Sequence, residues 1–267
     1  MSYIVQWNCR GLRANIDEVH ILIQNFLPDI FSFQETLLND TNPINFRKYT
    51  LLTSNPVIRD GRAHGGAALM INNNIPHSQI PITTNLQAVA ARVSLFQTVS
   101  VCSLYLPPSL PIDLKTLDDL LAQLPAPILL MGDFNAHSTL WGCRAVDGKG
   151  KQIEDFIANN NLCLLNTKCI TYIHPAAGSQ TSIDLTICDP SLMLDFRWSV
   201  HDDLCGSDHF PLIIENSKPT IATSTQRWKL NKGDWETFQS LCDNHLIGIS
   251  LSRPMILSRC LLLNFLK

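Results

Sequence analysis

The stretch LLMGDFNAH, residues 129–137, is the part of the sequence that most clearly indicates the fold. The apolar run from Pro127 to Met131 predicts a short buried strand, and at Gly132 the pattern changes to polar residues. In open α/β sheets, the crevice outside the carboxyl ends of the strands is the usual ligand site. Because side chains alternate in an extended segment, we expect Asp133 and Asn135 to point the same way and to form a candidate reactive pair.

Polar side chains also lie at or within several other predicted strands. Short runs with strand character cover residues 3–7, 30–33, 99–106, 183–187 and 211–214. The polar residues that accompany these runs are Asn8, Glu35, Tyr105, Asp184, Asp208 and His209. Singly, each is more often a turn, a cap or a packing residue. Together they supply the carboxylates, amide, phenol and histidine that metal-assisted phosphodiester hydrolysis requires.

Length, composition and charge limit the class of protein. A chain of 267 residues with 45% hydrophobic residues is long enough for one large α/β domain or two small ones. The predicted strands outnumber the helices interspersed among them, which favours an α/β fold with mixed sheets. The formal net charge of −3 excludes a global basic field. Contact with nucleic acid would therefore depend on local basic residues, among them Arg10 and Lys149.

The cysteine content and the hydropathy of the chain indicate the kind of cellular compartment in which the protein is expected. Nine cysteines without a Cys-x-x-Cys pair argue against a disulfide framework and a structural zinc site, and they favour a reducing compartment. The amino terminus lacks a basic segment followed by a long apolar one, so we expect no secretory signal. Residues 247–266 are apolar, but Arg253, Pro254 and Arg259 interrupt them, and we expect no membrane span.

The predicted donor set suits a hard divalent cation. Mg²⁺ prefers carboxylate and amide oxygens and needs only one or two carboxylates together with a substrate phosphate. Glu35 with Asn8, joined by Asp208, would supply those oxygens. Zinc would need a set dominated by His and Cys, which these residues do not offer.

Six ordered motifs resemble those of the endonuclease/exonuclease/phosphatase superfamily. They are QWNCRGL at 6–12, QE at 34–35, LY at 104–105, GDFNAH at 132–137, SIDL at 182–185 and GSDHFP at 206–211. The WNCRG opening and the WG at 141–142 are more narrowly similar to the endonuclease domain of jockey-like retrotransposons that lack long terminal repeats. The resemblance covers residues 1–216.

The resemblance implies a four-layer α/β sandwich of the deoxyribonuclease-I type, with two packed mixed β-sheets flanked by helices. It also implies a Mg²⁺-dependent DNA endonuclease, with Mn²⁺ as an alternative ion, that nicks the target site of a retrotransposon. The implied metal residues are Glu35, Asn8 and Asp208. Around the phosphodiester, the resemblance implies that Asp133 is the base and that Asn135 and Tyr105 bind the phosphate. It implies that Asp184 orients His209 beside them. The further implied substrate contacts are Asn166, Ser182 and Arg10.

Two regions outside the motifs carry open alternatives. Residues 171–180 form either a variable surface loop or the counterpart of a DNA-contacting hairpin in the resembling domains. Base readout there cannot be predicted from the sequence. His137 is assigned to the cleft or to the surface, and Trp141 is most simply a packed aromatic residue.

Residues 217–267 are expected to form a poorly ordered linker and tail after the main domain. Residues 226–235 resemble the connector that precedes a reverse transcriptase, and the chain ends before any polymerase motif, so we expect a truncated or misjoined reading frame. Two alternatives to a DNA endonuclease stay open: a phosphatase or phosphodiesterase of the same superfamily, and a silent retrotransposon fragment that only binds DNA. An intracellular, nuclear location is expected from the substrate alone.

Overall fold

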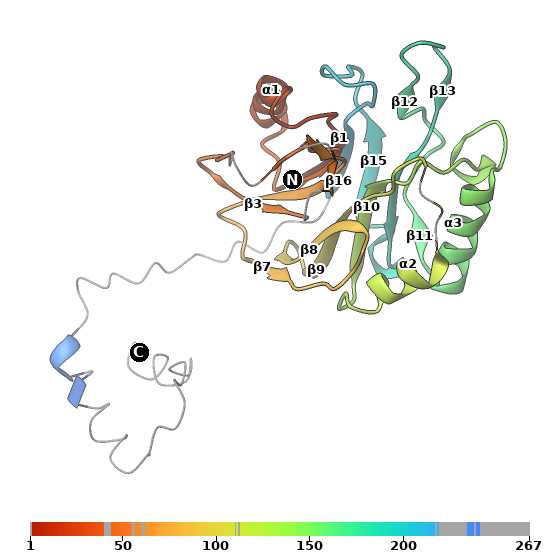
Figure 1. Cartoon of the computed structure of the whole chain (residues 1–267). Helices are drawn as coiled ribbons and strands as arrows, with labels where there is room; N and C mark the ends of the chain where they lie inside the picture. Colours follow the sequence, from red (N-terminus) through yellow and green to blue (C-terminus); the bar gives the residue numbers. More distant parts are fainter. Residues whose placement is uncertain are drawn as a thin grey trace. The chain divides into compact units, whose positions relative to one another are not determined.

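Two mixed β-sheets form the body of the fold, as the family resemblance implies (Figure 1). This computed structural model describes residues 2–39, 44–54, 57–59, 62–109, 111, 113–216, 218, 234–237 and 239–240. The chain divides into two units, Met1–Thr223 and Ser224–Lys267, and the sheets belong to the first. Most of the expected tail over 217–267, including nearly all of the expected connector, lies outside the described residues.

The first sheet has the strand order β15-β16-β1-β2-β6-β3. Its strands are β1 (Ser2–Asn8), β2 (Ile30–Gln34), β3 (Tyr49–Thr53), β6 (Ala67–Asn72), β15 (Phe196–Val200) and β16 (Leu212–Asn216). β1 and β2 run parallel, with Asn8 beside Gln34, and the other neighbouring strands are antiparallel. The parallel pair therefore brings the carboxyl ends of β1 and β2 to one edge of the sheet.

The second sheet has the order β11-β14-β10-β9-β8-β7. Its strands are β7 (His77–Ile80), β8 (Gln87–Ser94), β9 (Thr98–Tyr105), β10 (Ile128–Asp133), β11 (Cys163–Leu164) and β14 (Asp184–Cys188). β9 and β10 are parallel, whereas β8 and β9 form an antiparallel hairpin. Two small sheets pair β4 (Val57–Arg59) with β5 (Arg62–His64), and β12 (Tyr172–Ile173) with β13 (Gln180–Thr181). The stretch over 171–180 is therefore a hairpin.

Helices cover the outer face of each sheet. They are α1 (Ile16–Phe26), α2 (Leu114–Leu121) and α3 (Gly148–Asn159), with short 3-10 turns η1 (Thr139–Trp141) and η2 (Pro190–Leu192). Val19 and Leu22 of α1 are buried in one cluster with Trp7 of the first sheet, whereas the leucines of α2 and Phe156 of α3 share another cluster with Leu130 of the second. Among the described residues, no helix combines the length and apolar character needed to cross a membrane.

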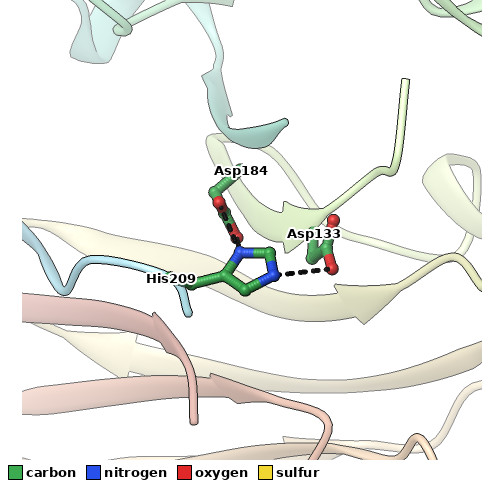
Figure 2. A group of neighbouring side chains, drawn as sticks. All are labelled: Asp133, Asp184 and His209. Atoms are coloured by element: carbon green, nitrogen blue, oxygen red, sulfur yellow. Dashed lines mark hydrogen bonds and ion pairs between the residues drawn. The ribbon is translucent and has the colours of Figure 1, made fainter. Parts of the chain in front are cut away.

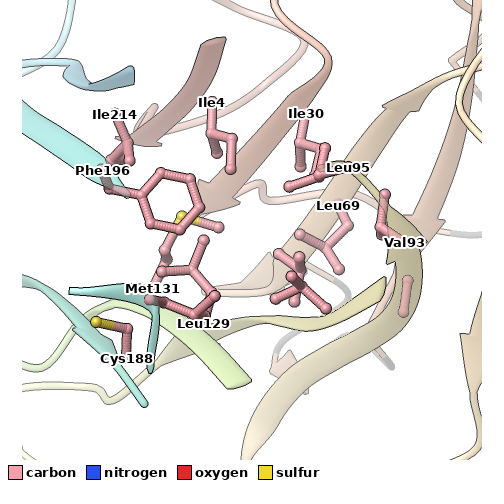
Figure 3. Packing of buried hydrophobic residues seen from close by; sticks show 14 of the residues in the cluster. Ile4, Ile30, Leu69, Val93, Leu95, Leu129, Met131, Cys188, Phe196 and Ile214 are labelled. Carbon is pink, nitrogen blue, oxygen red and sulfur yellow. The ribbon is translucent and has the colours of Figure 1, made fainter. Parts of the chain in front are cut away.

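A third cluster lies between the two sheets and completes the four layers. Ile4 and Ile214 of the first sheet pack there with Leu129 and Met131 of the second (Figure 3). Alternation along the strands produces this division, because Leu129 and Met131 face the other sheet while Leu130 faces the helices. The predicted four-layer α/β sandwich is confirmed.

A polar layer replaces the apolar core near the edge where β1, β2, β9 and β10 end. The Gln6 amide of β1 donates to the carbonyls of Gly132 (3.1 Å) and Leu185 (3.2 Å) in the opposite sheet. The Gln34 amide of β2 donates to the Ser103 hydroxyl of β9 at 3.0 Å. These buried hydrogen bonds join the two sheets directly beneath the candidate site.

Gly132 is required by close packing inside β10. A Cβ atom at this position would collide with the carbonyl oxygen of Leu104 on the neighbouring strand β9. The sequence suggests that the strand pattern changes at Gly132, but the strand continues through Asp133. Glycine therefore allows the last two residues of β10 to stay paired with β9, which places Asp133 at the end of a rigid element.

Candidate active site

The candidate site lies where strands of both sheets end. In the second sheet, Asp133 pairs with Tyr105 of β9 on one side and with Asp184 of β14 on the other. In the first sheet, Asn8 closes β1 and pairs with Gln34, directly before Glu35. By strand alternation, Asn8 faces the same interior as Ile4, and Asp133 the same interior as Met131. The two sheets thus present these polar groups to each other.

Asp133 is held by two amide side chains and a backbone N–H. The Asn8 Nδ2 and Asn135 Nδ2 atoms donate to its Oδ2 at 2.9 and 3.0 Å, and the Asn135 N–H donates to Oδ1 at 3.0 Å. The carboxyl is only 1% exposed. Burial, assisted by the charge of Asp184, raises its pKa to about 7, although His209 and the Asn8 hydrogen bond act in the opposite direction. Asp133 can thus change protonation state near neutral pH.

Asn135 reaches Asp133 by a route that differs from the expected one. The sequence predicts an extended segment in which residues 133 and 135 share a face. Instead β10 ends at Asp133, and Asn135 adopts a left-handed backbone conformation with φ 47°. This turn folds the Asn135 amide back onto Asp133 and onto the Leu106 carbonyl, which accepts a hydrogen bond at 3.2 Å. The two residues do meet, as a tight turn rather than as a strand pair.

His209 and Asp184 form a buried pair beside Asp133 (Figure 2). The Nδ1 atom of His209 lies 2.8 Å from Asp184 Oδ2 and 3.1 Å from Oδ1. Burial lowers the pKa of His209, but the charge and hydrogen bond of Asp184 outweigh it and raise the value to about 9. The imidazole is therefore a cation at neutral pH, and its Nε2 atom lies 4.0 Å from Asp133 Oδ2.

Glu35 and Tyr105 form the other side of the site. The Tyr105 hydroxyl donates to Glu35 Oε1 at 2.6 Å. Burial of the phenol, followed by the charge of Glu35, raises the pKa of Tyr105 well above its usual range, so the phenol keeps its proton. Glu35 adopts a left-handed φ of 49°, which turns the chain out of β2. The charge of Glu35 also raises the pKa of Asp133, so the two carboxylates act on each other across the site.

Two sets of side chains could hold a cation. Ligand atoms of Asp133, Asp184 and His209 all lie within 4.8 Å of one another. In that set, however, the His209 Nδ1 atom is engaged with Asp184, so a metal there would break the buried pair. Glu35 offers a partly buried carboxylate directly after Gln34, the strand partner of Asn8, and the Asn8 amide oxygen accepts from the Arg10 N–H at 3.1 Å. Carboxylate and amide oxygens of this kind suit Mg²⁺. The donor chemistry of Glu35 and Asn8 fits a hard cation better.

Asp208, which the sequence assigns to the metal, lies in an ion pair. Its Oδ2 atom is 3.2 Å from Arg10 Nη1, and the Arg10 side chain is more than half exposed. The preceding Ser207 hydroxyl donates to the Asn8 carbonyl at 2.8 Å, which ties this turn to the end of β1. The charge of Asp208 still reaches the site, since it raises the pKa values of His209 and Tyr105.

Asn166 and Ser182 lie behind the carboxylates rather than among them. The Asn166 amide donates to the Asp184 carbonyl at 2.8 Å and accepts from the Thr186 N–H at 2.9 Å, so it braces the backbone of β14. The Ser182 hydroxyl is buried without a hydrogen-bond partner among the described residues. Neither side chain meets Asp133 or Glu35 in a hydrogen bond within the described part of the chain.

His137 and Trp141 take the simpler of their expected roles. The half-exposed His137 ring pairs with Asp147 at 2.9 Å, on the loop that leads to α3. Trp141 is fully buried, and its indole N–H donates to the Ala136 carbonyl at 3.1 Å. Trp141 thus packs beneath the GDFNAH turn.

Thr171 is a site residue that the sequence did not reveal. Its buried hydroxyl donates to Asp184 Oδ2 at 2.6 Å and accepts from the N–H groups of Ile183 (3.1 Å) and Asp184 (3.2 Å). A threonine in a polar stretch gives no signal of such a role. Gln6 and Gln34 did leave a signal, since each is an amide in a largely apolar strand.

Comparison with known proteins gives related sequences. A family model described as "Endonuclease-reverse transcriptase" matches residues 99–213. The chain is 26% identical over 248 residues to a probable RNA-directed DNA polymerase from transposon X-element of Drosophila melanogaster, covering 91% of this chain and 27% of that protein. It is 26% identical over 247 residues to the RNA-directed DNA polymerase from mobile element jockey of Drosophila funebris, covering 90% and 26%. The chain thus spans about a quarter of these relatives.

Solved structures share the fold at low sequence identity. The endonuclease domain of TRAS1, a telomere-specific non-LTR retrotransposon, is 24% identical with a TM-score of 0.69, covering 82% of this chain and 99% of that domain. The 3′ phosphatase NExo from Neisseria, bound to a product DNA hairpin, is 16% identical with a TM-score of 0.63, covering 82% and 100%. At this level of identity the similarity concerns the fold.

Proposed function

Because the chain belongs to the endonuclease/exonuclease/phosphatase superfamily, we propose that it is a divalent-metal-dependent endonuclease that hydrolyses a phosphodiester bond of DNA. The observation that carries the proposal is the buried Asp133 carboxyl, held by Asn8 and Asn135 and faced by the His209–Asp184 pair. A base, amide donors and a cationic donor thus converge on one point, as attack of water on a phosphate requires. The similarity to polyproteins of mobile elements supports target-site nicking as the biological task.

The side chains divide the reaction between them. Asp133 orients the attacking water and takes its proton, a role that its pKa near neutral pH favours. The amide of Asn135 would donate to the phosphate in exchange for its hydrogen bond to Asp133, and the phenol of Tyr105 in exchange for its hydrogen bond to Glu35. His209 stays protonated through Asp184 and donates from Nε2 to a non-bridging oxygen, where negative charge develops in the transition state.

Glu35 and Asn8 are the proposed metal residues. A bound Mg²⁺ ion, or Mn²⁺ in its place, would neutralise charge on the phosphate and the leaving oxygen. The Tyr105 hydroxyl would leave Glu35 when it turns to the phosphate, so the Glu35 carboxylate would then be available to the cation. Asp208 contributes negative charge from beside the site, and Arg10 would meet a phosphate of the strand by exchanging its exposed ion pair with Asp208. Asn166 supports β14 from behind in this scheme.

The proposed endonuclease domain covers residues 1–216, and residues 217–267 form a linker and tail. DNA as the substrate favours a nuclear location. The hairpin formed by β12 and β13 lies beside His209, since the Tyr172 and His209 ring centroids are 4.6 Å apart. We assign this hairpin to the DNA-facing side of the domain.

Nicking of supercoiled plasmid in Mg²⁺ tests the proposal. Asp133→Asn should lower the rate by about 10²- to 10⁴-fold, the usual contribution of a general base, with an unchanged circular dichroism spectrum. Asp119→Asn on the exposed face of α2 is the matched control and should nick like the wild type. If the wild-type chain nicks no plasmid, the proposed nuclease function is refuted. Release of phosphate from inositol phosphates would instead support the phosphatase alternative. DNA binding without cleavage would support the alternative of a silent fragment.

A further inference from the structure

Lys149 lies in the first turn of α3 and extends toward the candidate site. Its Nζ atom donates to the carbonyl oxygens of Pro107 at 2.7 Å and Pro108 at 3.2 Å. These prolines come two and three residues after Tyr105, the last residue of β9. Lys149 thus joins α3 to the segment that leaves the site.

The segment 105–108 is the link between three site residues. The Leu106 N–H donates to the Asp133 carbonyl at 2.9 Å, and the Leu106 carbonyl accepts from the Asn135 amide at 3.2 Å. Tyr105 reaches Glu35 through its hydroxyl. The same segment continues into one wall of a cavity of about 340 Å³ that Glu35 and Tyr105 also line. Any shift of this segment would move both proposed phosphate donors.

Only the carbonyl groups of the two prolines can be tied down, because proline has no backbone N–H. A cationic donor suits this task, since hydrogen bonds from an ammonium group are stronger than neutral ones. Burial lowers the pKa of Lys149, but the carboxylates of Asp133 and Asp147 favour its charged form. The ammonium group therefore acts on the site's electrostatics as well as on the backbone.

The start of α3 is built to hold Lys149 in place. Asp147 caps the helix by accepting from the Gly150 N–H at 2.6 Å, and it also accepts from the His137 N–H at 3.2 Å. Gly150 has no room for a side chain, because a Cβ atom would collide with the His137 carbonyl. The helix consequently begins in contact with the loop that follows Asn135, and the position of Lys149 is set by the motif itself.

We propose that Lys149 is a positioning residue that fixes the segment 105–108, and through it the two phosphate donors Tyr105 and Asn135. The catalytic part of this assignment rests on the proposed nuclease function. The structural part does not, since the hydrogen bonds of Lys149 exist without substrate.

The experiment compares Lys149→Met with Lys151→Met in the 267-residue chain. Lys151 lies on the same helix, is well exposed and pairs with Asp155 at 3.0 Å, so it controls for loss of one lysine. In Lys149→Met we expect kcat for plasmid nicking to fall by about 10- to 100-fold, because the phosphate donors Tyr105 and Asn135 would be misplaced. We expect KM to stay within about threefold of the wild-type value. Lys149→Arg should restore at least part of the loss, because arginine can also donate to both carbonyls.

Amide hydrogen exchange at Leu106 provides a readout that needs no activity. We expect its exchange to be at least about tenfold faster in Lys149→Met and unchanged in Lys151→Met. Unchanged exchange at Leu106 would overturn the proposal, whether or not the wild type nicks DNA. A second result in Lys149→Met would also overturn the proposal: a raised KM with unchanged kcat, and a plot of log binding constant against log salt concentration whose slope is smaller by about one. That result would mean that Lys149 binds a DNA phosphate instead of positioning the segment 105–108. If Lys149→Met does not fold, amide exchange at Leu106 is compared between Lys149→Arg and Lys149→Gln. Exchange that is faster in Lys149→Gln than in Lys149→Arg supports the proposal, and equal exchange overturns it.

Discussion

Replacing Thr171 with valine would remove a buried hydroxyl at almost constant volume. That hydroxyl donates to the Asp184 carboxylate and accepts from two backbone N–H groups, of Ile183 and Asp184. Valine keeps the β-branched shape but can make none of these bonds. The substitution therefore tests the hydrogen bonds separately from the packing.

The expected cost follows from the three partners of the hydroxyl. A hydrogen bond to a charged group contributes about 1.5 to 3 kcal/mol, and a buried N–H left without an acceptor costs about 1 to 3 kcal/mol. Even the lower ends of these ranges give a loss of about 3 to 4 kcal/mol. For a domain of this size, that corresponds to a decrease in Tm of roughly 10 °C. Thr171→Ser keeps the hydroxyl and loses one methyl group, so it should cost only about 1 kcal/mol.

Urea denaturation followed by far-ultraviolet circular dichroism measures both variants against the wild type. We expect the free energy of unfolding to fall about 2 to 3 kcal/mol further for Thr171→Val than for Thr171→Ser, with similar m-values. Nicking should follow the same order, because a loosened Asp184 orients His209 less well. Equal stability of the two variants would refute the reasoning, since the hydroxyl would then contribute nothing.

Three further outcomes are expected. Gly132→Ala should lower the free energy of unfolding in urea by about 2 kcal/mol or more, because the new Cβ atom would collide with the neighbouring strand β9. Gly148→Ala is the control and should be neutral, because a Cβ atom there would meet open space. Asp184→Asn should lower kcat at least about tenfold with little change in KM, since His209 loses its charged partner; equal rates would contradict the pairing. Glu35→Gln should abolish the rise in Tm on adding Mg²⁺ that we expect of the wild type, and an undiminished rise would remove Glu35 from the metal site.

The sequence predicted the strand ends of the site well because their arrangement depends on local patterns. Apolar runs locate β1, β2, β9 and β10, and parallel pairing brings their carboxyl ends together. Asn8, Glu35, Tyr105 and Asp133 therefore meet as expected. The α/β class with mixed sheets followed from the order of the predicted strands and helices, whereas the four layers were implied by the family resemblance. In the structure, each main sheet packs one face on the other sheet and one on the helices.

Other features could not be predicted because they depend on contacts between distant segments. The left-handed turn at Asn135 reverses its side chain, and no alternation rule anticipates this. Asp208 meets Arg10 only because the turn before Phe210 docks on the end of β1. Thr171 became important only when β12 paired with β13 and carried its hydroxyl beneath Asp184.

The site draws its two halves from different sheets, so its geometry depends on how the sheets are held together. Glu35 and Asn8 belong to the first sheet, whereas Asp133 and Asp184 belong to the second. Apolar packing alone would tolerate small sliding of one sheet over the other, because it is not directional. Gln6 opposes such sliding, since its amide donates to the carbonyls of Gly132 and Leu185, each next to one of the two aspartates. The Gln34 and Asn8 amides add hydrogen bonds to Ser103 and to Asp133 itself. Buried amides of the first sheet therefore set the distance between the proposed metal residues and the proposed base.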